Sequence, residues 1–294
     1  MPVNPSGASI AAVTHHRVTV NDTDLHYVSA GSDGSPILLV HGFPESWWAF
    51  HKLIPLLAAT HRVFAVDLRG FGDSAIAEDA DDSAVAAEDL HSLIAALDVG
   101  PVHVAGQDIS GGAAFRLASA HPEDLLSVTA IEMGLAGFGL ESLADVTRGG
   151  SWHIGVLAAP GIPDLLLVGR ETELLAALFG SMVAVDGALD DGDIAEFART
   201  YSRPGGWRGA AGLYRAMLNE GDTIRQLANN TPLTMPVLAV GAGGGAFTSA
   251  TMEQVVAGRL DAVSLEGVGH YAALEAPDAL ADEILGFAAS VDGA

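Results

Sequence analysis

The feature that most constrains the fold is a short apolar strand that runs into a glycine turn and then a helix. Residues 102–105 are mainly apolar, Gly106 follows them, and Gly112 lies in the first turn of a helical stretch. This strand–turn–helix context is typical of a nucleophile elbow, usually written G-x-S-x-G, which presents one side chain at the edge of a parallel sheet. Asp108 occupies the nucleophile position. The motif therefore predicts an α/β fold with a carboxylate at its elbow.

A carboxylate at this position cannot form the acyl-enzyme of a serine hydrolase, but it can attack an sp³ carbon and leave an alkyl ester. Ser110 does not restore a serine mechanism, because Asp108 rather than glycine lies two positions before it. The alternative is an ordinary glycine-rich turn in which the aspartate caps a helix. As a nucleophile, Asp108 narrows the chemistry to opening an epoxide or displacing a halide.

Composition sets further bounds. The 294 residues, 49% hydrophobic and 17% charged, suffice for one large α/β domain with an insertion. A net charge of -24 argues against nucleic-acid and anionic-membrane partners. The chain has no cysteine, and its histidines lack metal-ligand spacing, so we expect neither metal nor cofactor. Residues 1–13 do not resemble a signal peptide, and no apolar run could span a bilayer, so the predicted location is cytoplasmic.

Strand-like runs alternate with helical patterns along much of the chain, which indicates a mostly parallel, eight-stranded sheet with helices on both faces. The predicted strands are 17–20, 25–29, 37–40, 63–66, 102–105, 127–131, 237–240 and 262–265. The predicted helices are 48–59, 83–97, 112–121, 251–258 and 279–290. Asn21-Asp22 joins the first two strands as an antiparallel hairpin. The alternation stops after the sixth strand, which predicts a helical cap over 134–234 inserted into a core of 1–133 and 235–294.

Two loops supply partners for the elbow. The run His41-Gly42-Phe43-Pro44 follows a strand, and its turn can aim the N–H of Phe43 above the elbow. With the N–H of Ile109 it would form an oxyanion hole for an ester of Asp108. His270, in a glycine-flanked loop after the last strand, is the candidate general base. Taken alone, the first loop could be a simple turn and the histidine structural.

The third member of the catalytic set is Glu132. The loop 241–247 after the seventh strand carries no carboxylate, whereas Glu132 directly follows the strand next to the elbow strand. A carboxylate there is costly to bury unless it is paired, and pairing with His270 would orient the imidazole. The alternative is a glutamate at a surface edge.

The predicted cap contributes aromatic candidates. The phenol of Tyr214 can donate a hydrogen bond to an epoxide oxygen, and Trp152 or His153 can supply a second donor. Trp47 and Tyr201 are candidates for lining the substrate pocket. Each of these rings could instead serve only in packing, the alternative favoured for the tryptophans.

The chain resembles epoxide hydrolases of the α/β-hydrolase fold over nearly its whole length. The matching motifs are His41-Gly42-Phe43-Pro44, the run 67–74, Gly106 to Gly112, the cap run 201–215 and Gly269-His270. The resemblance implies that Asp108 is the nucleophile, His270 the base and Tyr214 a proton donor. The family's usual acid after the seventh strand is missing, and Glu132 takes the place used by some haloalkane and fluoroacetate dehalogenases.

These relatives leave two alternatives. A dehalogenase could use the same Asp108, and Trp152-His153 resembles the halide-pocket segment of fluoroacetate dehalogenases. Haloalkane dehalogenases similar to this chain place tryptophan at position 109, and fluoroacetate dehalogenases place arginine at 109 and 112, where this chain has Ile109 and Gly112. A neutral epoxide, opened with water to a diol, therefore fits better. The other alternative is a non-catalytic ligand binder.

Composition also bears on the source of the chain and on its substrate. The composition, with one lysine and an excess of Ala, Gly and Asp, is typical of a high-GC bacterial gene. The cap has few charges, which favours a roomy, apolar pocket. An epoxide formed in antibiotic biosynthesis, on an aromatic polyketide, is therefore a reasonable substrate. We expect a monomer or a homodimer.

Overall fold

A nine-stranded sheet forms the centre of the computed structural model, which describes residues 1–76 and 82–293. The strand order is β1-β2-β3-β5-β4-β6-β7-β8-β9, with β4 to β9 parallel and β1 to β3 antiparallel at one edge. The strands are β1 Pro2–Val3, β2 Thr14–Val20, β3 Thr23–Ala30, β4 Pro36–Val40, β5 Arg62–Val66, β6 Val102–Gln107, β7 Leu125–Ile131, β8 Val237–Gly241 and β9 Leu260–Ser264.

The sheet confirms the predicted α/β architecture and adds one strand. β1 was missed because its two residues form no pattern of their own and pair with His15 and His16 of β2. The predicted hairpin is present. Asn21 and Asp22 both have positive φ, 45° and 57°, as a two-residue turn between twisted antiparallel strands requires.

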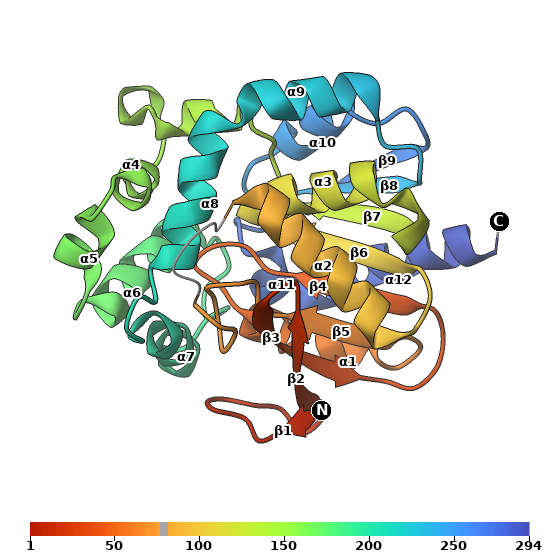
Figure 1. Ribbon diagram of the computed structural model, residues 1–294, viewed down its shortest axis with the longest axis horizontal. Coiled ribbons are helices and arrows are strands. Elements are labelled where there is room, and N and C mark those ends of the chain that lie inside the picture. The colour runs from red at the N-terminus through yellow and green to blue at the C-terminus, as the bar shows by residue number, and fades with distance from the viewer. Residues whose placement is uncertain (77–81, 294) are drawn as a thin grey trace.

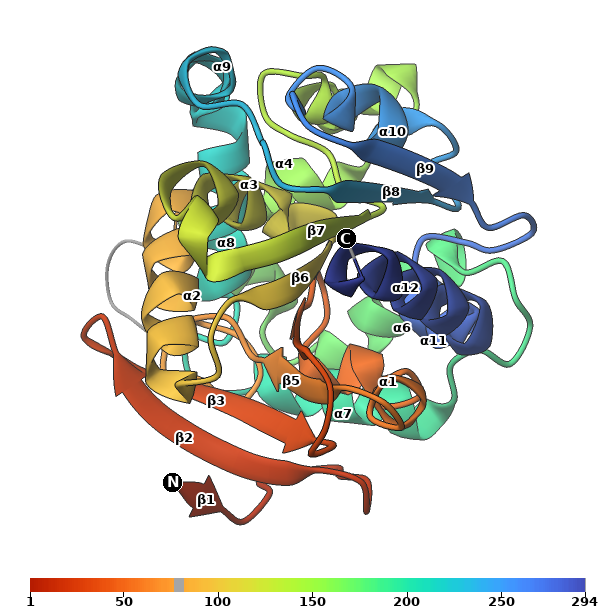
Figure 2. The ribbon, with the colours of Figure 1, turned by 90° about the vertical axis from the view of Figure 1, so that its right-hand side faces the viewer.

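Helices cover both faces of the sheet (Figures 1 and 2). α1 and α12 lie on one face, whereas α2 and α3 pack side by side on the other. Their bounds are α1 Ile54–Leu57, α2 Ser83–Leu97, α3 Gly111–Ala120, α10 Phe247–Met252, α11 Ala272–Glu275 and α12 Pro277–Asp292. Short 3-10 helices are η1 Trp47–Phe50, η2 Asp108–Ser110 and η3 Pro122–Asp124. The central strands β4, β6 and β8 are buried at every residue, which explains their continuous apolar character.

Two predicted helices differ from the structure. The helix expected over 48–59 is divided into η1 and α1, and Pro55 lies in the first turn of α1, where its missing N–H is tolerated. The helix expected over 251–258 is instead α10, which ends at Met252. Residue Val256 then bridges to Leu233, and a side chain at Gly258 would lie 2.4 Å from the carbonyl oxygen of Thr234. Close approach of two backbone segments therefore ends the helix early.

The segment between β7 and β8 is helical. The end of the alternation between strand-like and helical runs after the sixth predicted strand had indicated this. Residues 134–234, all described by the structure, contain η4 Leu140–Ala144, η5 Val146–Arg148, α4 Trp152–Ala158, α5 Ile162–Leu167, α6 Glu171–Met182, α7 Asp191–Tyr201, α8 Arg208–Asn219 and α9 Gly221–Asn230. Helices α4 to α8 gather to one side of the sheet, at the left of Figure 1. Within the described chain, every helix is too short or too polar to cross a membrane.

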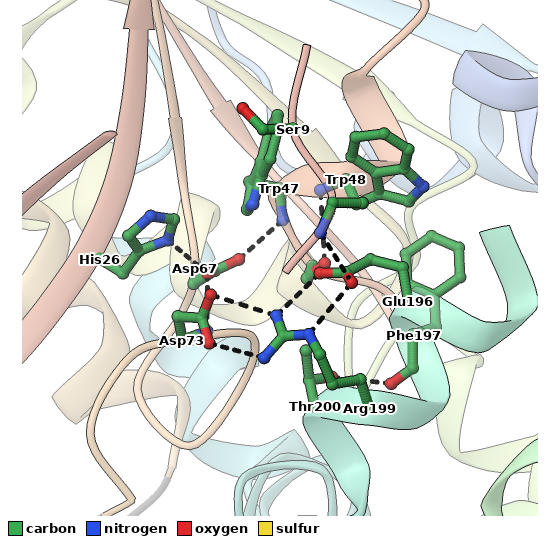
Figure 3. A network of polar contacts seen from close by, with 12 residues as sticks. Ser9, His26, Trp47, Trp48, Asp67, Asp73, Glu196, Phe197, Arg199 and Thr200 are labelled. Carbon is green, nitrogen blue, oxygen red and sulfur yellow. Dashed lines mark hydrogen bonds and ion pairs between the residues drawn. The ribbon is translucent and has the colours of Figure 1, made fainter. Parts of the chain in front are cut away.

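A buried network of charged side chains fastens α7 to the core (Figure 3). Arg199 donates to both oxygens of Asp73 at 3.0 and 3.1 Å, and also to both oxygens of Glu196 at 3.0 and 2.7 Å. Glu196 also accepts the N–H of Ala8 at 3.0 Å. The two carboxylates are 7% and 6% exposed, so Arg199 supplies most of the positive charge and hydrogen bonding that offsets their burial. The network therefore joins α7, the loop before α2 and the N-terminal segment.

Removing the arginine tests this fastening. Arg199→Ala should lower the free energy of unfolding by about 3 kcal/mol, because two buried carboxylates lose their partner. Arg225→Ala is the matched control: Arg225 pairs with Asp222 at the surface, and its loss should stay within about 1 kcal/mol. Chemical denaturation measures both variants. Equal losses would show that the network adds nothing beyond a surface ion pair.

Candidate active site

Asp108 lies at a sharp elbow between β6 and α3. Its backbone is in the left-handed region, with φ of 53°, which a non-glycine residue adopts only when the surrounding structure imposes it. Glycines make room for the turn: a Cβ at Gly42 would lie 2.5 Å from that of Asp108, and one at Gly111 would lie 2.7 Å from the carbonyl oxygen of Gly134. The strained elbow therefore holds the carboxylate at the carboxyl edge of the sheet, as the motif predicted.

The two oxygens of Asp108 have different surroundings. Oδ2 accepts the backbone N–H of Phe43 at 3.0 Å, whereas Oδ1 lies 3.5 Å from Nε2 of His270. The Asp108 side chain is 18% exposed and that of His270 is 21% exposed, so a small molecule can reach both. The backbone N–H of Ile109, the other predicted donor, helps to lower the pKa of this carboxyl.

Glu132 completes a line of three groups. Nδ1 of His270 lies 3.2 Å from Oε2 of Glu132, which follows β7 with a positive φ of 49°. The glycine-rich loop after β8 carries no acid, but its amides hold this one: Ala242 N–H donates at 2.6 Å and Gly244 N–H at 2.8 Å. A Cβ at Gly244 would lie 3.1 Å from Oε2, so the loop can approach because it is glycine. The structure thus brings together all three predicted residues.

The three charges determine the protonation of the site. Burial opposes a charged imidazole, but Asp108 and Glu132 outweigh it and raise the pKa of His270 to about 10. Burial likewise opposes a charged Asp108, yet His270 and the N–H groups of Phe43 and Ile109 lower the pKa of the carboxyl. At neutral pH the site therefore holds an imidazolium between two carboxylates.

The helical segment 134–234 places two polar side chains above the elbow. Nε2 of His153, on α4, lies 3.2 Å from the hydroxyl of Tyr214, on α8. The ring of Phe43 contacts both, with centroid distances of 5.5 Å to His153 and 5.3 Å to Tyr214. Burial lowers the pKa of His153 to about 4 and raises that of Tyr214 well above 10. Both groups are thus neutral at pH 7. They lie next to Phe43, whose backbone N–H binds Asp108.

The other predicted aromatic residues have different positions. Tyr201, at the end of α7, lies over Phe43 with a centroid distance of 6.0 Å, and its buried hydroxyl has no hydrogen-bond partner in the described chain. Trp152 is 49% exposed, so the structure does not support it as a donor at Asp108. Trp47 does not line this site either. It is a buried residue of η1, and its ring packs against those of His15 and Trp48.

Sequence reasoning missed a buried carboxyl group beside the elbow. Glu45 is completely buried, accepts the N–H of Gly42 at 3.0 Å, and binds the side-chain amide of Gln107 at 2.9 and 3.0 Å. Burial raises the pKa of Glu45 to about 8, and the nearby charge of Asp108 adds to the rise. Its position directly after Pro44, in a run of apolar residues, was the only available signal.

Glu45→Gln should therefore change how stability depends on pH. Unfolded glutamate loses its proton near pH 4.5 and the folded residue near pH 8, so folded wild type binds more protons between these values. Wild-type stability falls with rising pH in this window, by up to about 1.4 kcal/mol per pH unit from this group. The variant has no carboxyl group at this position, so its melting temperature minus that of wild type should increase from pH 5 to pH 8. A difference in melting temperature that stays constant across that range would contradict the raised pKa of Glu45.

Comparisons with known proteins agree with this geometry. Residues 35–277 match the family described as alpha/beta hydrolase fold. The soluble epoxide hydrolase of Corynebacterium sp. strain C12 is 30% identical, covering 94% of this chain and 97% of the relative. A fluoroacetate dehalogenase from Burkholderia sp. is 28% identical, covering 81% of each. Among solved structures, Cfl2 from Burkholderia cenocepacia has 30% identity and a TM-score of 0.86, covering 94% and 96% of the two chains.

Proposed function

We propose that this chain, which belongs to the α/β-hydrolase fold family, is an epoxide hydrolase that forms a covalent ester on Asp108. The observation that carries the proposal is the placement of the two carboxylate oxygens. One is fixed by the N–H of Phe43, and the other faces His270. Likeness to the Corynebacterium epoxide hydrolase over nearly the whole of both chains supports the same reaction.

Ring opening uses the two neutral groups on the helical segment 134–234, which we interpret as the cap. Oδ1 of Asp108 attacks an epoxide carbon while Oδ2 remains bound to Phe43. The carbon–oxygen bond of the ring breaks, and the oxygen takes a proton from the hydroxyl of Tyr214. His153 Nε2, 3.2 Å from that hydroxyl, orients the phenol or donates a second hydrogen bond, depending on its tautomer.

Ester formation then converts His270 into a base. The ester removes the negative charge of Asp108, one of the two carboxylates that raise the pKa of the imidazole. The pKa of His270 therefore falls, and the ring gives its proton to the phenolate left on Tyr214. The neutral ring then takes a proton from water that attacks the ester carbonyl. Glu132 stabilises the resulting imidazolium, and the N–H groups of Phe43 and Ile109 stabilise the oxyanion. The ester bond then breaks, and the diol oxygen takes the second proton of the attacking water, which restores the Asp108 carboxylate beside protonated His270.

The surroundings of Asp108 favour an uncharged substrate. Position 109 is an isoleucine, 7% exposed, which offers neither a cation nor a hydrogen-bonding side chain. A side chain at Gly112 would begin 3.0 Å from Cβ of Ser83 and 3.2 Å from a carboxylate oxygen of Glu220, so the position is already closed. The ring of Phe43, beside the elbow, contacts the rings of both Tyr201 and Tyr214. An apolar epoxide, such as one on an aromatic polyketide, suits this lining.

Product analysis of the wild-type protein tests the proposal. The protein is incubated separately with uncharged aryl and alkyl epoxides, with haloalkanes and with fluoroacetate, and diol and free halide are measured. We expect diol from at least one epoxide and far slower release of halide. Faster halide release than diol formation would make the protein a dehalogenase. Absence of turnover across all three classes, with ligand binding retained, would favour a non-catalytic binder.

A further inference from the structure

Four metal-ligating side chains gather where α2 meets the end of α3. Nδ1 of His91 lies 2.6 Å from Oδ2 of Asp124, and Nε2 of His121 lies 3.1 Å from Oε1 of Glu88. The two imidazole rings are stacked, with centroids 3.7 Å apart and planes within 10°. One ligand atom from each of His91, His121 and Asp124 lies within 4.8 Å of the others. No other such group of three occurs within residues 1–76 and 82–293.

The sequence did not reveal this group, because the histidines show no metal-ligand spacing along the chain. His91 lies on α2, thirty residues before His121 at the end of α3, and Asp124 follows in η3. No short ligand motif spans such a distance. The three come together only because α2 and α3 pack side by side and the chain turns into η3 directly after α3 (Figure 2).

The geometry of these side chains suits a bound cation. Two imidazole rings and two carboxylates from α2, the end of α3 and η3 turn nitrogen and oxygen atoms toward one another over a short distance. A divalent transition-metal cation binds imidazole nitrogen and carboxylate oxygen together, so one ion could be held by all of these groups.

We propose that His91, His121 and Asp124 form a binding site for a transition-metal dication of the Zn²⁺ class. Imidazole nitrogen and carboxylate oxygen are its usual ligands, at about 2.0–2.2 Å, so the side chains must close inward from their present separation. They have freedom to do so, since His91 is 34% exposed, His121 20% and Asp124 17%. Glu88, 53% exposed, can reach the fourth position or leave it to water.

The site is separate from the proposed chemistry. Asp108 precedes α3 and His121 follows it, so the ten-residue helix, about 15 Å long, separates the two. The metal would join α2, α3 and η3 on the opposite edge of the sheet from the carboxyl ends of the strands. We therefore expect it to raise thermal stability and to leave turnover unchanged.

Titration of the intact protein with ZnCl₂ tests the site. Calorimetry should show one Zn²⁺ per chain, and saturation should raise the melting temperature by a few degrees. CoCl₂ should produce the visible absorption of a four- or five-coordinate ion. His91→Ala and His121→Ala should each weaken Zn²⁺ binding at least about tenfold. Glu88→Gln should have a smaller effect.

His16→Ala is the matched control, because His16 is a half-buried histidine of β2 whose side chain bonds to Ser29 and stacks on Tyr27. It should bind Zn²⁺ as wild type does. The melting temperature of each variant in a chelator shows that loss of binding does not reflect unfolding, and Asp124→Asn offers a variant of unchanged size. Absence of saturable binding in wild type, or an affinity for Zn²⁺ in both histidine variants equal to that of wild type, would overturn the proposal.

Discussion

Asp108→Ala should lower kcat for epoxides by at least about 10⁴-fold, because the proposed pathway has no other group to form the ester. The variant should fold, since it removes a charge held against burial and keeps the Cβ of residue 108 that Gly42 leaves room for. The measurement is diol formation at saturating substrate, with the melting temperature as a check on folding.

Ser110→Ala is the control that separates the two possible nucleophiles of the elbow. The Ser110 hydroxyl donates to the carbonyl oxygen of Gln107 and accepts the Gln107 N–H, so it supports the turn and does not face Asp108. Its loss should reduce kcat by less than about tenfold. Substantial activity in Asp108→Ala together with an inactive Ser110→Ala would replace the aspartate mechanism by a serine mechanism.

Tyr214→Phe should slow ring opening by about 10²- to 10⁴-fold, because the departing oxygen loses its proton donor. Hydrolysis of the ester should change much less, since that step uses His270. Single-turnover experiments with excess enzyme separate the two steps by following substrate loss and diol release. Enzyme ester should therefore accumulate less in this variant than in wild type.

Variants of His153 and Tyr27 provide further tests of how the epoxide oxygen receives its proton. His153→Phe removes the partner 3.2 Å from the Tyr214 hydroxyl and should also slow ring opening, whereas His153→Gln keeps a hydrogen-bonding group and should slow it less. Tyr27→Phe changes a half-buried tyrosine of β3, which β5 and β4 separate from the elbow strand β6, and should leave both steps as in wild type. An unchanged rate of ring opening in Tyr214→Phe would assign the proton to another group.

Local sequence signals predicted which residues lie together at the elbow. Asp108 and Phe43 each follow a buried strand, and the carboxyl ends of adjacent parallel strands meet at one edge of the sheet. The same rule placed Glu132, because β7 pairs with β6 on one side and β8 on the other. The acid missing from the loop after β8 could thus be found on the neighbouring strand. That the loop amides hold it was visible only in three dimensions.

Side-chain direction was the part that the sequence could not supply. Trp152 and His153 are adjacent on α4, yet one is 49% exposed and the other 7%, because successive helix positions point about 100° apart. Trp47 was a candidate for lining the substrate pocket, but its ring packs against His15 of β2. The cluster at His91 and His121 depends on the packing of two helices, which no periodicity encodes.

The most direct test of the central claim is the intact mass of His270→Gln after exposure to an epoxide that the wild type hydrolyses. Without its base, the variant should open the ring and then stall at the ester. The account predicts a mass gain equal to the whole epoxide, on the peptide that contains Asp108, with no such gain in wild type. A variant that stays unmodified while the wild type turns over the same epoxide would contradict the covalent mechanism.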